Sequence, residues 1–265
     1  MPIAAVVNVP GGEIAYEESG SGEALLLVSG LNGVGRYWKP QVELFSKYFR
    51  VITYDQRGTG GSDRIQREFS VDQMGEELVG LMDVLKIERA HLVGMSTGGA
   101  IGQTIAIEHP ERLLKLVLCS TWTHCDPWFR RLFTARRDMY RQAGPDLHSQ
   151  FHPLFLYSPD YVNTHDAEIE AERARAPTKS SPVEVSVARI EALMRFDRRA
   201  GLPKIRAETL VMGTGTDFIT PSYFSKALAQ SIPGAKLVLY DDGGHSFTTT
   251  RAESFNRDCL EFLRK

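Results

Sequence analysis

The chain has 265 residues, with 31 Lys or Arg against 33 Asp or Glu, so its formal net charge is −2. This near-neutrality argues against a nucleic-acid binder, because such proteins carry a basic surplus that neutralises phosphates. No apolar run reaches the roughly 18 residues that cross a bilayer, the first residues lack the features of a signal peptide, and three cysteines are too few for a disulfide scaffold. The composition predicts a soluble, cytoplasmic protein that acts apart from membranes and nucleic acids, and it permits a homo-oligomer.

Short β-type segments alternate with helical patterns in the first part of the chain. Strands are expected at residues 3–9, 13–18, 24–28, 51–54, 91–94 and 114–118, and helices at residues 37–48, 70–85 and 100–108. The run Ala-Leu-Leu-Leu-Val at 24–28 is continuously apolar, as is typical of a strand buried on both faces. Ser70 is a favourable N-cap for a helix whose apolar residues recur at helical spacing. This alternation predicts a mostly parallel sheet covered by helices.

The alternation stops between residues 122 and 207, where helical fragments divided by prolines replace strands. It resumes with strands at residues 209–212 and 236–240 and helices at residues 222–231 and from 253. A helical stretch of this length is too long for an ordinary crossover between strands. We therefore expect an α/β fold in which residues 1–121 and 208–265 form the core domain and residues 122–207 form an inserted helical cap, or lid.

The segment Gly94-Met95-Ser96-Thr97-Gly98 lies between a predicted strand and a predicted helix. Glycines at this spacing allow a sharp strand-to-helix turn that lifts the serine above the sheet, where a helix N-terminus favours a developing anion. The alternative is a glycine-rich turn without chemistry. A dinucleotide site fits poorly, because the glycine spacing is wrong for one. The sequence thus predicts Ser96 as a nucleophile, with the N–H of Thr97 as an oxyanion donor.

A nucleophilic serine needs a base, and His245 is the best placed of the seven histidines. It follows Gly243-Gly244 directly after a predicted strand, and so should lie on the same sheet edge as Ser96. An exposed loop histidine is the alternative. His148 and His152 are four residues apart and could share a metal, but without a third ligand we expect two partly exposed helix residues.

The imidazole in turn needs a carboxylate that fixes its tautomer. Asp217 follows the predicted strand at residues 209–212 and also falls at the carboxyl edge of the sheet. Asp126 is the alternative acid. Asp241 and Asp242 are too close in sequence to His245 to orient it easily, and we interpret them as turn residues.

A second oxyanion donor should come from the glycine-rich loop at residues 29–35, after the strand at 24–28. Leu31 N–H is the best candidate in that loop. The loop does not have the pattern of a phosphate-binding P-loop. Chemistry of this kind requires neither a metal nor an organic cofactor.

Taken together, these segments resemble the α/β-hydrolase superfamily over nearly the whole chain. The order Ser96, Asp217, His245 is that of its catalytic triad, and residues 55–62, Asp-Gln-Arg-Gly-Thr-Gly-Gly-Ser, match a structural loop of the family. One departure is Ser29-Gly30, where most relatives carry His-Gly, although the backbone amide is retained. The resemblance implies an α/β-hydrolase fold and a serine hydrolase that acts through an acyl-enzyme.

Two groups within the superfamily are especially similar. Residues 29–38 and the segment His-Pro-Leu-Phe-Leu-Tyr at 152–157 resemble the aminoacrylate hydrolases of uracil catabolism. The core, including residues 81–87, is similar to the 3-oxoadipate enol-lactonases. Both groups hydrolyse small carboxylate-bearing substrates, which implies a small ester, lactone, amide or enamine-type substrate here. The alternatives are a cofactor-free carbon–carbon hydrolase or perhydrolase on the same fold, and a small-molecule receptor with little turnover.

The expected cap carries several candidate substrate contacts. Five arginines face a single acid between residues 128 and 141, and an arginine fork suits a carboxylate, although a solvated helix face is the alternative. The five are Arg130, Arg131, Arg136, Arg137 and Arg141. Aromatic and methionine side chains could line a pocket or form the cap's own core. The substrate contacts that we predict are Arg36, Trp122, Arg130, Tyr157 and Met194.

Overall fold

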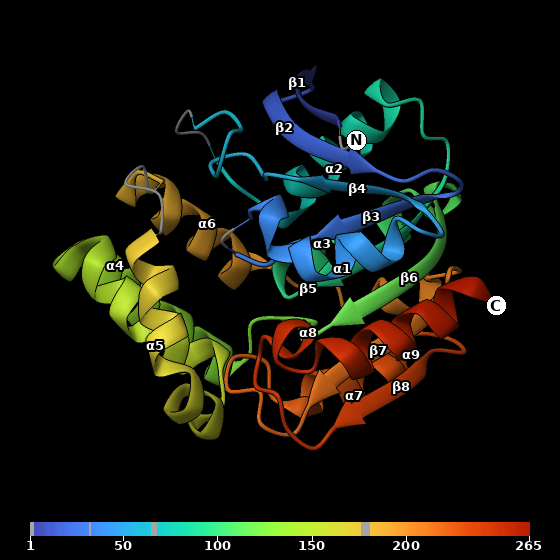
Figure 1. Ribbon diagram of the computed structural model, residues 1–265. Coiled ribbons are helices and arrows are strands. Elements are labelled where there is room, and N and C mark those ends of the chain that lie inside the picture. The colour runs from blue at the N-terminus through green and yellow to red at the C-terminus, as the bar shows by residue number, and fades with distance from the viewer. Residues whose placement is uncertain (1–2, 32, 65–67, 176–180) are drawn as a thin grey trace.

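The computed structural model describes residues 3–31, 33–64, 68–175 and 181–265 (Figure 1). One eight-stranded sheet crosses the molecule in the order β1-β2-β4-β3-β5-β6-β7-β8. The strands are β1 (Ile3–Val9), β2 (Gly12–Ser19), β3 (Ala24–Val28), β4 (Arg50–Tyr54), β5 (Ala90–Met95), β6 (Leu113–Cys119), β7 (Glu208–Thr214) and β8 (Lys236–Tyr240). The predicted strands are all present: three have the expected bounds, and the other five are one to three residues longer.

The direction of the strands places the loops that matter for function at one edge. β1, β2 and β4 pair antiparallel, whereas β4, β3, β5, β6, β7 and β8 run parallel. The carboxyl ends of parallel strands meet at one edge of a sheet. The loops that follow β3, β5, β7 and β8 therefore converge there, although they are far apart in sequence.

Helices cover both faces of the sheet, as the sequence predicts. Successive residues of β3 point to opposite layers: Leu26 and Val28 pack with α2, α3 and α7, while Leu25 and Leu27 pack with α1 and α9. The core helices are α1 (Lys39–Phe45), α2 (Val71–Val84), α3 (Thr97–Glu108), α7 (Ser222–Ser231), α8 (Phe247–Thr250) and α9 (Ala252–Arg264), with short 3-10 turns at Gly35–Trp38, Pro110–Arg112 and Leu202–Lys204. Ser70 caps α2 as predicted, its Oγ accepting from the N–H of Gln73 at 3.0 Å.

The helix expected at residues 37–48 is instead divided. A 3-10 turn covers Gly35–Trp38, and α1 occupies only Lys39–Phe45. Pro40, near the start of α1, has no N–H and is tolerated only in the first turn of a helix, so it fixes the point at which the α-helix begins. In the described part of the chain, no helix combines the length and apolar character needed to cross a membrane.

Three helices, α4 (Pro127–Leu156), α5 (Pro159–Arg175) and α6 (Val183–Arg195), occupy the segment between β6 and β7. They form the lobe at the left of Figure 1, and residues 176–180 of the expected cap lie outside the described residues. α4 reverses direction at Gly144, which has a φ of +79° and a ψ of −178°. The two arms of α4 then face each other, since the rings of Tyr140 and His148 stack at 4.0 Å.

Candidate active site

Ser96 lies in a tight turn between β5 and α3. Its φ of +54° and ψ of −114° are strained for a residue with a side chain, and it is only 7 % exposed. A Cβ on Gly98 would lie 2.0 Å from the carbonyl oxygen of Val28, and one on Gly94 would lie 2.3 Å from the Gly98 oxygen. Only glycine fits at these two positions. The turn therefore has the geometry expected of a nucleophile elbow.

Two candidate oxyanion donors lie next to this turn. Thr97 begins α3, so its N–H is among the helix amides that have no partner within the helix. Gly30 lies alongside, because a Cβ there would be 3.3 Å from Ser96 Cβ. The loop is held in place by Arg189, whose Nη2 donates to the Leu31 carbonyl oxygen at 2.9 Å. The β3 loop that carries Leu31 is thus beside Ser96; Asn32 of this loop lies outside the described residues.

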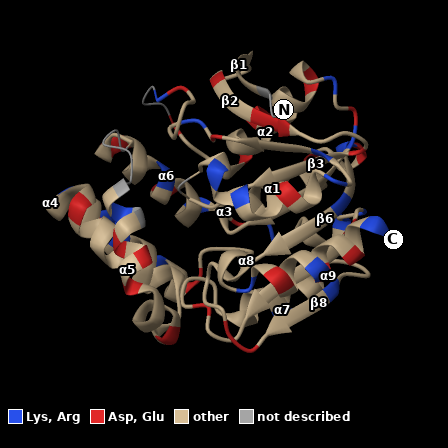
Figure 2. Ribbon diagram, viewed as in Figure 1, with Lys and Arg blue, Asp and Glu red and all other residues tan. Residues whose placement is uncertain are grey.

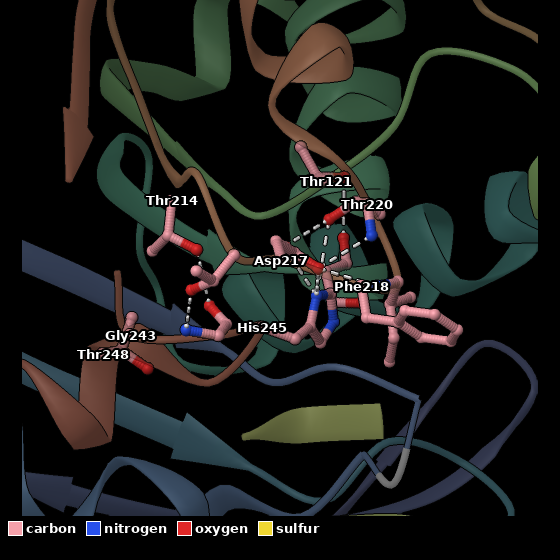
Figure 3. A network of polar contacts seen from close by, with 12 residues as sticks. Thr121, Thr214, Asp217, Phe218, Thr220, Gly243, His245 and Thr248 are labelled. Atoms are coloured by element: carbon pink, nitrogen blue, oxygen red, sulfur yellow. Dashed lines mark hydrogen bonds and ion pairs between the residues drawn. The ribbon is translucent and has the colours of Figure 1, made fainter. Parts of the chain in front are cut away.

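His245 and Asp217 form a buried pair. Nδ1 of His245 lies 3.0 Å from Oδ1 and 2.9 Å from Oδ2 of Asp217, and the two residues are only 3 % and 4 % exposed (Figure 3). The alternative of an exposed loop histidine is therefore wrong. Three further donors to Asp217 come from the turn that follows it: Ile219 N–H at 2.9 Å, and Thr220 N–H and Oγ1 at 2.8 Å each.

The electrostatics of this pair favour an ionised carboxylate. Burial by itself would raise the pKa of Asp217, but the neighbouring His245, the hydrogen bond to it and the Thr220 N–H together hold that pKa below its usual value. A carboxylate of this kind can fix the imidazole tautomer and stabilise an imidazolium.

The alternative acid, Asp126, has other partners. It is the N-cap of α4, where Oδ1 accepts from the N–H of Phe129 at 2.8 Å, and its Oδ2 accepts from the hydroxyl of Tyr223 at 2.5 Å. Both oxygens are engaged in fixing the start of the helix. The geometry places Asp217, and not Asp126, against His245.

The prediction that His148 and His152 are partly exposed is wrong for His148, which is only 3 % exposed. Burial, together with the charge of Arg136, lowers the pKa of His148 to about 2 and that of His152 to about 3. In the described ranges, no group of three or more His, Cys, Asp or Glu side chains is arranged to hold a metal ion. The two histidines belong instead to the packing of α4, whose reversed arms enclose His148.

Two of the predicted substrate contacts lie beside loops that carry proposed site residues. Arg36 is exposed and lines a cavity of about 670 Å³, together with Leu31, between the β1–β2–β4 edge and helices α4 and α6. Tyr157 follows the end of α4, where its Cα would be 3.0 Å from a Cβ on Gly244. Tyr157 is therefore beside the loop that carries His245.

The other three predicted contacts have different surroundings. Trp122 is fully buried and stacks on Phe129 with ring centroids 4.7 Å apart. Arg130 is exposed and lines a shallow hollow on the outer side of α4. Met194 is partly buried, with its Sδ 3.8 Å from Thr134 Oγ1. The structure does not bring these three side chains together with the buried His245–Asp217 pair.

Sequence reasoning missed two elements of the site. Thr220 holds Asp217 by two hydrogen bonds, and the spacing of an Asp three residues before a Thr was the available signal for such a turn. The end of α4 also contacts the histidine loop, because Ser246 N–H donates to the Leu156 carbonyl oxygen at 3.0 Å. No local pattern in the sequence signals that second contact, since it joins segments 90 residues apart.

The chain is similar to known proteins of one class. Residues 23–251 match the model of the family described as alpha/beta hydrolase fold. Among solved structures, the enol-lactonase from Burkholderia xenovorans LB400 is 28% identical, with a TM-score of 0.91 over 98% of this chain and 100% of that chain. A thermophilic esterase from Thermogutta terrifontis, with malate bound, is 29% identical, with a TM-score of 0.87 over 99% of this chain and 98% of that chain.

The chain belongs to the alpha/beta hydrolase family, and it is a hydrolase. A curated relative from Caulobacter sp. (strain K31), named "Putative carbamate hydrolase RutD", is 38% identical over 91% of this chain and 90% of its own length. A relative of the same name from Azorhizobium caulinodans is 34% identical over 94% of each chain. These findings confirm the predicted fold class and the resemblance to hydrolases of uracil catabolism and to enol-lactonases.

Proposed function

We propose that this protein is a serine hydrolase with Ser96 as nucleophile, His245 as general base and Asp217 as the acid that orients it. The observation that carries the proposal is the buried contact of His245 Nδ1 with Asp217 at 2.9 and 3.0 Å, at the sheet edge where Ser96 occupies its strained turn. Each residue follows a different parallel strand, and chain order alone would not bring them together without this sheet.

The proposed reaction has two steps. His245 takes the Ser96 proton as the hydroxyl attacks a carbonyl carbon, and the N–H groups of Leu31 and Thr97 stabilise the oxyanion. The tetrahedral intermediate then collapses, which breaks the bond to the leaving group while His245 returns the proton to it and Ser96 remains acylated. In the second step a water that gives a proton to His245 attacks the acyl-enzyme, and the acid is released as the proton returns to Ser96. Each oxyanion donor contributes about 3–4 kcal/mol of transition-state stabilisation.

The proposed substrate is a small ester, lactone, amide or enamine-type compound that bears a carboxylate. The support comes from relatives named for carbamate and enol-lactone hydrolysis and from the esterase that holds malate. Residues 122–207 would act as the cap over the nucleophile, because the end of α4 contacts the loop that carries His245. In this proposal the end of α4 that contacts the histidine loop lies beside the bound substrate.

The test is covalent labelling of the nucleophile. The protein is treated with a fluorophosphonate and the adduct is located by mass spectrometry, and Ser96→Ala is compared with the parent on p-nitrophenyl esters. We expect labelling at Ser96 and a loss of kcat of at least about 10³-fold in Ser96→Ala. The matched control is Ser225→Ala, which replaces another buried serine, on α7, and should retain both the label and the turnover.

Labelling elsewhere than at Ser96, or full turnover by Ser96→Ala, would refute this mechanism. Tight binding of a carboxylate ligand without any product from the ester, lactone and amide panel would point instead to a receptor.

A further inference from the structure

Arg136 is a buried cation on the first arm of α4 that stands apart from the other buried arginines. It is only 2 % exposed, its Nε has no hydrogen-bond partner, and the one polar contact of its guanidinium in the described residues is with His148. Arg57 and Arg189 also have one unpartnered nitrogen each, but both make short hydrogen bonds through their other nitrogens. Arg57, by contrast, pairs with Glu77 at 2.5 Å. Arg189 donates to three acceptors: the carbonyl oxygens of Arg57 and Leu31 at 2.7 and 2.9 Å, and Gln56 Oε1 at 2.6 Å. Within the described residues, Arg136 has no carboxylate partner.

The surroundings of Arg136 suit an anion. Its guanidinium carbon lies 5.0 Å from the ring centroids of both Phe133 and Phe155, and its Nη2 lies 3.5 Å from His148 Nε2. Burial lowers the pKa of Arg136 to about 10, so it remains a cation at neutral pH. A buried cation without a counter-charge is costly, and a bound carboxylate would relieve that cost.

Arg136 is linked to the loop of the proposed catalytic histidine through the second arm of α4. Phe155, one of its aromatic walls, immediately precedes Leu156, whose carbonyl oxygen accepts from the N–H of Ser246. His152 lies on the same arm as Phe155, where burial and the charge of Arg136 lower its pKa to about 3. The second arm of α4 therefore connects the guanidinium to the histidine loop and carries a neutral imidazole.

Two of the other four arginines of this arm pair with acids. Arg137 pairs with Asp138 at 2.9 Å, and Arg141 pairs with Glu191 at 2.8 Å. Figure 2 shows charges of both signs along α4 and α5. Arg130 and Arg131 are exposed to solvent. Of the five arginines, Arg136 is therefore the one that is buried without an acid beside it in the described ranges.

We infer that Arg136 binds the carboxylate of the substrate, and so selects small acyl compounds that carry a negative charge. The inference rests on the proposed function, since it assigns a residue to the substrate of that same site. An Arg fork binds a carboxylate through two parallel N–H groups, and the Nε–H that has no acceptor is available for one of them.

The test compares a charged ester with a neutral one of matching length, p-nitrophenyl hemiglutarate and p-nitrophenyl hexanoate. Arg136→Met should lower kcat/KM for the charged ester by on the order of 10²-fold, mainly through KM, and change that for the neutral ester by less than about threefold. Arg136→Lys should fall between the parent and Arg136→Met. The control, Arg141→Met, removes a paired surface arginine of the same arm and should leave the ratio of the two esters unchanged.

Two further measurements separate binding from folding. Glutarate should protect Ser96 from fluorophosphonate labelling in the parent, and Arg136→Met should need about 100-fold more glutarate for the same protection. Its melting temperature should not fall, because a buried charge without a counter-charge has been removed. Equal loss of both esters, or an unchanged ratio with intact Ser96 labelling, would overturn the role of Arg136 alone. Failure to label Ser96 in the parent would instead overturn the proposed function.

Discussion

The carboxyl edge of the sheet and the reversed helix α4 differ in whether their buried charged groups have partners of opposite charge. At the sheet edge, Asp217 accepts from its own turn and from His245, so its charge is fully compensated within the protein. In α4, the buried Arg136 and His148 lie among aromatic rings without an acid in the described residues. Compensated groups are fixed before the substrate arrives, as electrostatic catalysis requires. A buried charged group without such a partner, such as Arg136, is available to pair with a charged group of a ligand.

The two regions also require glycine for different reasons. Gly98 is fixed by its surroundings, because any Cβ there would strike the backbone of β3. Gly144 has nothing within 4 Å of such a Cβ, and its glycine is needed only for the positive φ of the reversal. The sheet edge is therefore determined by close packing, and the reversal of α4 by local backbone conformation.

Among the variants that test this difference between the two regions, the largest effect on kcat is expected from replacing the carboxylate of Asp217 at the sheet edge. Asp217→Asn should retain the fold but lower kcat by about 10⁴-fold, because an amide in place of the carboxylate favours the wrong imidazole tautomer. The measurement is steady-state hydrolysis of a p-nitrophenyl ester, with circular dichroism as the check on folding.

Asp126→Ala is the matched control for that variant. Loss of this N-cap should cost about 1 kcal/mol of the free energy of unfolding, while kcat changes only a few-fold. If Asp126→Ala lost turnover and Asp217→Asn retained it, the two acids would have to exchange roles.

A pair of glycine variants tests the difference in packing. Gly98→Ala should lower the free energy of unfolding by more than about 3 kcal/mol, because its methyl group would lie 2.0 Å from the Val28 carbonyl oxygen and the backbone must shift. Gly144→Ala should cost about 1–3 kcal/mol, because its φ and ψ lie in a region that is essentially restricted to glycine, although nothing lies near the added methyl group. Urea unfolding of the two proteins measures both values. Equal costs would show that the sheet edge relaxes as readily as the reversal of α4.

The smallest expected effect concerns the acid stability of α4. Burial lowers the pKa of His148 from 6.5 to about 2, and Arg136, Tyr140 and His152 surround its ring. Between these two pH values the unfolded chain binds a proton that the folded protein does not. His148 therefore contributes stability that is present above pH 6.5 and is lost as the pH falls below it, by on the order of 1 kcal/mol per pH unit.

His148→Phe should flatten this dependence, as measured by urea unfolding at about pH 7 and about pH 5.5, on either side of the ordinary histidine pKa. Asp217 does not interfere in that window, because its lowered pKa places its own titration at more acidic pH. An unchanged slope in His148→Phe would assign the acid sensitivity to another group, such as His152.

The sequence by itself determined the succession of strands and helices along the chain and the local geometry of the turns. Gly94 and Gly98 flank Ser96 because the turn needs them, and within the loop at residues 55–62 Asp55 accepts from the N–H of Gly61 at 2.8 Å. Such features depend on neighbouring residues and on the rule that parallel strands end at one edge, so short windows of sequence suffice to predict them.

Only the tertiary structure decided which acid meets the histidine and which arginine is buried. Asp126 and Asp217 both follow strands, and the difference arises because Asp126 caps α4 while the turn after β7 carries Asp217 to His245. Arg136 is one of five similar arginines in sequence, and its burial follows from the reversal at Gly144 that folds the second arm of α4 over it. Both contacts join segments that are distant in the sequence. They depend on how helices and loops pack together, and the periodicity of the sequence does not predict them.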